Sequence, residues 1–183
     1  RRQRQMCIRD SYDDVGATVN GNSVVLLLEY GERRILLTGD LNTKSMEDIL
    51  EFYSQEGQEP GDILRADVYK AAHHGSQHFS LQFLKTVKPD AAVISSGDDR
   101  YDVHGHPRAV LMGTITRYSD SEKPAVFSTE LAACYSPLPA KQQKQFKAGS
   151  VQLYERSIQG IVHLRSDGQR LYLGTVFGRK PPE

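Results

Sequence analysis

Side chains that can bind metal ions or transfer protons follow three apolar segments of this sequence, at the point where each segment ends. They are Asp40, the adjacent pair His73 and His74, and the pair His104 and His106. The carboxyl ends of strands in an α/β sheet open onto a common edge, so these side chains are expected to meet there. Carboxylate and imidazole groups suit Zn²⁺, Mn²⁺ or Fe, whereas a structural zinc site is usually rich in thiolates. The pattern therefore favours an open, hydrolytic metal site.

The elements that must position these side chains alternate between strands and helices. A β-hairpin is expected first, followed by alternating helices and strands. The expected ranges are strands at 23–30 and 33–38, a helix at 43–56, a strand at 67–72, a helix at 80–87, a strand at 91–96 and a helix at 107–118. Thr43 is the expected N-cap of the first helix, and Pro107 is expected in the first turn of the last. This order predicts an α/β layered domain.

The remaining segments differ in composition from this core. The polar stretch 135–157 predicts a flexible insertion, and 158–183 predicts a closing β-hairpin around the turn at Asp167 and Gly168. Residues 1–11 are basic and resemble translated sequencing-adapter sequence, although a disordered basic tail would look the same. The domain proper is therefore expected to occupy 12–134 together with the closing hairpin.

Length, charge and apolar content restrict the function classes. The chain has 183 residues, and its 23 basic and 23 acidic side chains cancel, so no global field draws it to nucleic acid. Its longest apolar run, Val24–Leu28, is far shorter than the roughly 20 residues of a membrane-spanning helix, and no secretory signal precedes it. The cytoplasm is favoured for the segment as given, while a membrane-tethered or exported parent protein stays open.

Five short motifs, taken in order, resemble one known family. They are Asn22-Ser-Val-Val-Leu26, Leu36-Leu-Thr-Gly-Asp40, Asp67-Val-Tyr-Lys-Ala-Ala-His-His-Gly-Ser76, Pro89-Asp-Ala-Ala-Val-Ile-Ser95 and His106-Pro107. The series resembles the second half of a metallo-β-lactamase-fold domain, in the subgroup of the C-terminal domain of the bacterial competence protein ComEC. The resemblance implies an αββα sandwich and extends from about residue 20 to residue 127.

The resemblance also implies a role for each motif residue. Asp40 matches the carboxylate that bridges two metals, and His74 is the better candidate for the late histidine ligand. His73 is the alternative ligand, or a neighbour of the metals or the substrate. The resemblance gives substrate contacts to three further residues: His106, Ser76 and Asn22. The expected cofactor is Zn²⁺, as two ions in the intact protein, with Mn²⁺ as an alternative.

The family's first metal-binding loop, His-x-His-x-Asp-His, has no counterpart among the six histidines of this chain. The chain is therefore expected to be a truncated fragment that carries about half of the metal site and is inactive alone. The intact protein is expected to hydrolyse a phosphodiester, with DNA as one candidate substrate. A metal-bound hydroxide is expected to attack the ester. Two alternatives stay open: a non-catalytic scaffold that binds a partner, and a small-substrate phosphoesterase of the phosphorylcholine-esterase type.

Each candidate residue also has a purely structural interpretation. Asp40 could serve only as an acidic residue at the start of the next helix, where the helix dipole favours it. His73 and His74 could be hydrogen-bonded residues at a strand end. His106 could be a turn residue before a proline.

Overall fold

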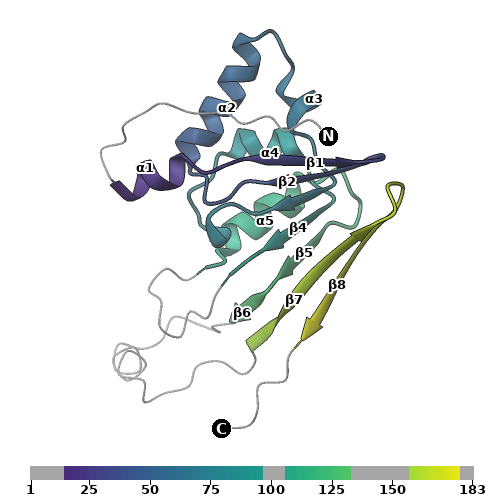
Figure 1. Cartoon of the computed structure of the whole chain (residues 1–183). Helices are drawn as coiled ribbons and strands as arrows, with labels where there is room; N and C mark the ends of the chain where they lie inside the picture. Colours follow the sequence, from purple (N-terminus) through teal and green to yellow (C-terminus); the bar gives the residue numbers. More distant parts are fainter. Residues whose placement is uncertain (1–14, 97–105, 133–156, 178–183) are drawn as a thin grey trace, which may run out of the picture.

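The computed structural model describes residues 15–96, 106–132 and 157–177, and a five-stranded sheet forms its centre (Figure 1). The strands lie in sequence order: β1 (Leu26–Tyr30), β2 (Arg33–Leu37), β3 (Val68–Lys70), β4 (Ala91–Ile94) and β5 (Ala125–Ser128). β1 pairs antiparallel with β2, as the hairpin signal predicts, and the other three pairings are parallel. The predicted α/β class is confirmed, and the layers are compatible with an α/β sandwich.

Helices cover one face of this sheet. The helical segments are α1 (Val15–Gly21), α2 (Thr43–Gln55), α3 (Pro60–Leu64), the single turn η1 (His73–Gly75), α4 (Leu81–Val87) and α5 (Ala109–Arg117). Met46 of α2, Phe83 of α4 and Leu111 of α5 are buried in one core with Leu36 and Tyr69 of the sheet. Removing this apolar surface from water is the main force that holds the helices against the strands.

A second sheet packs on the opposite face. It consists of β6 (Glu130–Ala132), β7 (Ser157–Ser166) and β8 (Leu171–Phe177), all antiparallel. Leu164, Leu171 and Leu173 pack against a smaller core that contains Ile35 and Val68. The predicted closing hairpin is therefore present, and it covers part of the face that the helices leave open.

Several local expectations are wrong in detail. The N-cap of α2 is Asn42 rather than Thr43, and its side chain accepts a hydrogen bond from the Ser45 N–H at 3.0 Å. Pro107 lies outside α5, which begins at Ala109. The residue between them, Arg108, is the N-cap and has extended backbone, as N-cap residues do. The short helices α1 and α3 are not among the predicted elements. The helix propensity of so few residues is a weak signal, and tertiary packing decides whether such helices form.

Some expectations fall on residues that the structure does not describe. The basic leader 1–11 lies outside the described residues, as do 135–156 of the predicted insertion. Within the described part of the chain, no helix combines the length and the apolar character that crossing a bilayer requires.

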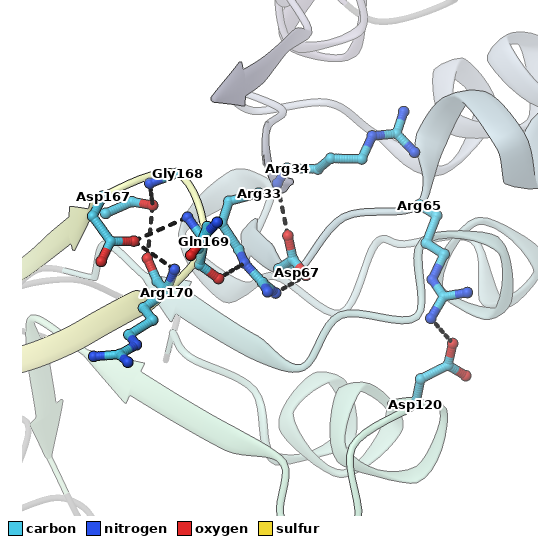
Figure 2. A network of polar contacts seen from close by, with 10 residues as sticks. Arg33, Arg34, Arg65, Asp67, Asp120, Asp167, Gly168, Gln169 and Arg170 are labelled. Carbon is cyan, nitrogen blue, oxygen red and sulfur yellow. Dashed lines mark hydrogen bonds and ion pairs between the residues drawn. The ribbon is translucent and has the colours of Figure 1, made fainter. Parts of the chain in front are cut away.

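Asp67 anchors the closing hairpin to the start of the sheet (Figure 2). Its carboxylate accepts the backbone N–H of Arg34 at 2.7 Å and a guanidinium N–H of Arg33 at 3.2 Å. Arg33 in turn donates through Nε to the carbonyl of Gln169, in the β7–β8 turn, at 2.6 Å. The backbone N–H of Glu32 donates to the neighbouring carbonyl of that turn at 2.7 Å. One carboxylate thus orients the arginine that joins the two sheets.

Replacing Asp67 by alanine is expected to lower the free energy of unfolding by about 1–3 kcal/mol, because a backbone N–H and a guanidinium lose a charged acceptor. Asp48→Ala is the matched control. It removes only the i,i+4 pair with Lys44 on α2, worth about 0.3–0.5 kcal/mol. Urea denaturation of both variants measures the difference, and equal losses would contradict the anchoring role of Asp67.

Candidate active site

The carboxyl end of β2 forms a tight turn that presents Asp40. Gly39 has φ +53°, and a Cβ at this position would lie only 3.0 Å from the Cβ of Ser23. The Asp40 N–H donates to the Ser23 hydroxyl at 3.0 Å. The backbone carrying the carboxylate is therefore held in place, while 39% of the Asp40 side chain stays exposed.

The carboxyl end of β3 forms a left-handed turn, η1, beside Asp40. The φ angles of its three residues are 48° at His73, 52° at His74 and 87° at Gly75. Positive φ is costly for residues with a Cβ, and such strain is often found at functional sites. The turn is fixed to the segment after β2 by the His73 N–H, which donates to the Gly39 carbonyl at 3.1 Å.

His74 lies between β4 and Asp40. Its Nδ1 is 2.6 Å from the carbonyl oxygen of Ser95, just past the end of β4. A carbonyl can only accept, so Nδ1 carries a proton, and in the neutral ring Nε2 presents its lone pair. That Nε2 is 3.6 Å from Oδ1 of Asp40. A hydrogen bond that fixes the tautomer in this way is typical of metal-binding histidines.

The distance between His74 Nε2 and Asp40 Oδ1 limits what can stabilise the pair. At 3.6 Å the contact is too long for a good hydrogen bond. A lone pair facing a carboxylate is favourable only with positive charge present, either a proton on Nε2 or a cation between the two atoms. Two ligands of one tetrahedral zinc, each about 2.0–2.2 Å from the metal, lie roughly 3.3–3.6 Å apart. The donor types and the spacing thus both fit one shared metal ion.

His73 makes different contacts from its neighbour. Its Nε2 is 3.4 Å from the side-chain nitrogen of Asn20, and its ring meets the ring of His106 edge to face with centroids 5.8 Å apart. The structure therefore brings His74 next to Asp40, and places His73 with His106 and Asn20.

The other predicted substrate residues lie in different environments. Ser76 is 3% exposed, and its hydroxyl accepts the His78 N–H at 3.2 Å. Asn22 is exposed and donates to the Thr18 carbonyl at 2.8 Å, at the end of α1. His104 lies outside the described residues. Of the three predicted substrate residues, His106 is the one whose side chain meets a predicted metal-site side chain, whereas Ser76 contacts His73 only through its backbone N–H, which donates to the His73 carbonyl at 2.9 Å.

The metal site is incomplete within the described residues. No group of three or more His, Cys, Asp or Glu side chains is placed there to hold a metal ion. Asp40 and His74 could supply two ligands, and a complete centre would need further donors. The predicted two-metal arrangement and the choice of zinc both stay predictions.

Lys70 is a neighbour of this site that the motif analysis did not select. It is the last residue of β3, and its Nζ donates to the Gly39 carbonyl at 3.0 Å. Burial lowers the pKa of the Lys70 amine, and the negative charge of Asp40 offsets this in part. The available sequence signal was a lysine within an otherwise apolar strand, since lysine is rarely buried without a partner.

A cavity of about 240 Å³ lies elsewhere, between β1, α2 and α3. Leu27, Ile49 and Tyr53 are among its apolar lining residues. None of the predicted site residues lines it. The candidate site is therefore an open edge of the sheet and does not coincide with this cavity.

Known proteins share sequence with about half of this chain. It is 30% identical over 105 residues to ComE operon protein 3 of Bacillus subtilis and 30% identical over 103 residues to Recombination protein 2 of Haemophilus influenzae. It is 40% identical over 97 residues to Competence protein ComA of Neisseria gonorrhoeae. Homologues of this chain are thus competence proteins. This supports the competence part of the resemblance, and the metallo-β-lactamase fold stays a prediction.

The matched region is a small part of each relative. It covers 52–56% of this chain but only 12–13% of the length of those proteins. No protein-family model and no solved structure matches the chain.

Replacing Gly75 by alanine is expected to destabilise the protein by about 2–4 kcal/mol, through the positive φ and through overpacking. A Cβ there would lie 2.7 Å from Pro107 and 2.9 Å from Ile94. The control is Gly113→Ala in α5, where a Cβ meets nothing within 4 Å and should add about 0.5–1 kcal/mol of stability. Chemical denaturation separates the two, and a neutral Gly75→Ala would contradict the described packing of η1.

Proposed function

We propose that this chain carries part of the active site of a metal-dependent hydrolase that acts on a phosphodiester, with DNA as the candidate substrate. The observation that carries the proposal is the arrangement of His74. Its Nδ1 is held by the Ser95 carbonyl at 2.6 Å, and its Nε2 faces Asp40 Oδ1 at 3.6 Å. A tautomer fixed by backbone and aimed at a carboxylate supports metal ligation by both side chains.

The chain's own residues position and charge this site. Ser23 fixes the backbone of Asp40, and Ser95 fixes the ring of His74. Both side chains stay partly open to solvent, at 39% and 50% exposed, so a substrate can reach them. A divalent cation held there would polarise a phosphoryl oxygen and lower the pKa of a coordinated water.

A phosphodiester is preferred because of the relatives. Two of them are named as a competence protein and a recombination protein, and recombination acts on nucleic acid. The zero net charge of this chain gives no general attraction to DNA, so recognition of a phosphate must be local. Other parts of a longer protein could add basic surface.

Metal binding by this chain is the first test. Titration with Zn²⁺, followed by imidazole ¹⁵N NMR, is expected to shift Nε2 of His74 while Nδ1 keeps its proton. Asp40→Ala should weaken this binding about tenfold or more, because the carboxylate, one of the two side-chain ligands, is lost. Asp48→Ala, which removes the pair with Lys44 on α2, should leave the titration unchanged. A His74 ring that does not respond to Zn²⁺ would argue against metal ligation.

Hydrolysis is the second test. The full-length gene product is expected to hydrolyse a chromogenic phosphodiester when Zn²⁺ or Mn²⁺ is added, and Asp40→Ala is expected to abolish this activity. Activity that needs no metal and survives Asp40→Ala would refute the proposal. Full-length protein that binds metal but hydrolyses neither this compound nor DNA would favour the non-catalytic scaffold.

A further inference from the structure

Lys70 places a half-buried ammonium group directly beside the candidate site. It follows Val68 and Tyr69 at the end of β3, and it pairs in register with Leu37 of β2. Its Nζ reaches across to the Gly39 carbonyl at 3.0 Å, one residue before Asp40. The pairing with β2 and the hydrogen bond to Gly39 therefore fix where this positive charge lies.

The hydrogen bond to Gly39 uses one of the three donors of the ammonium group. A second side-chain contact for Nζ is not found among the described residues. Removing part of a lysine's charge from water costs free energy. The negative charge of Asp40 offsets this cost in part, although Lys70 and Asp40 do not form a direct ion pair. An anion that arrives at the Asp40 and His74 edge would use the remaining donors.

We propose that Lys70 is the anion-recognition residue of this site, and that its ammonium binds a nonbridging oxygen of the substrate phosphodiester. This inference rests on the proposed function, because it places the phosphate next to Asp40 and His74. Lys70 would then select negatively charged phosphodiesters over neutral esters of similar size. It also explains how a chain with no net charge could recognise a phosphate.

The proposal predicts that one substitution weakens the affinity for a phosphodiester without weakening the affinity for the metal ion. In Lys70→Met, dimethyl phosphate is expected to bind about tenfold more weakly, since a charge-assisted hydrogen bond is lost. Mn²⁺ is expected to bind as tightly or more tightly, because a like charge beside Asp40 has been removed. A merely structural role for Lys70 would instead weaken both affinities together.

The experiment uses this chain, Mn²⁺ and two small probes. Mn²⁺ binding is measured by electron paramagnetic resonance, and probe binding is measured by the ³¹P relaxation that bound Mn²⁺ causes. Dimethyl phosphate is the charged probe, and trimethyl phosphate is its neutral counterpart. Lys70→Arg should retain most of the affinity for dimethyl phosphate. Lys88→Met removes a half-exposed lysine beyond the far end of α4 and should change nothing.

The outcomes separate this inference from the proposed function. Unchanged dimethyl phosphate affinity in Lys70→Met, with Mn²⁺ still bound, overturns the role of Lys70 alone. An equal loss of affinity for dimethyl phosphate and for trimethyl phosphate also overturns it, because Lys70 would then not distinguish the charged probe from the neutral one. Failure of the wild-type chain to bind Mn²⁺ overturns the proposed metal ligation by Asp40 and His74, and this inference with it. Should Lys70→Met fail to fold, Lys70→Gln takes its place and the same comparisons apply.

Discussion

The carbonyl oxygen of Gly39 accepts two hydrogen bonds, and the backbone bond from His73 holds the two loops of the candidate site together. The His73 N–H donates to it at 3.1 Å and the Lys70 ammonium at 3.0 Å, so both ends of the segment that leaves β3 are tied to the turn that leaves β2. A carbonyl has two lone pairs, so one backbone group can hold both partners. The His73 bond acts together with the pairing of β2 with β3 and with the Thr38 hydroxyl, which donates to the Lys70 carbonyl at 2.9 Å, to keep Asp40 and His74 at one edge.

The η1 turn shows how strain and packing are combined at this edge. His73 and His74 both have positive φ, which costs free energy at residues that carry a Cβ. Gly75 completes the turn at φ +87° and lies against Pro107, in the segment that leads into α5. The turn is therefore determined by contacts from three directions, and its two side chains point to different partners: His74 to Asp40 and His73 to Asn20 and His106.

Stability and candidate chemistry lie at opposite ends of the same short strands. β2 begins at Arg33, where Asp67 and the β7–β8 turn form the polar network, and it ends just before Asp40 (Figure 2). The network joins the two sheets through the partly buried ion pair of Arg33 and Asp67. The opposite edge keeps partly exposed side chains and a lysine that is only partly paired. A rigid scaffold with an open edge of this kind suits ligand binding at the carboxyl ends of parallel strands.

The sequence by itself determined the α/β class, the β1–β2 hairpin and the position of Asp40 and His74 after successive strands. Apolar periodicity and turn residues are local signals, and the parallel order then brings strand ends to one edge. Only the tertiary structure decided that His74 rather than His73 faces Asp40, since this depends on a left-handed turn and on the Ser95 carbonyl. It also decided that Lys70 belongs to the site and that Ser76 is buried, because both depend on contacts between residues distant in sequence. Such contacts leave no pattern in the spacing of residue types along the chain.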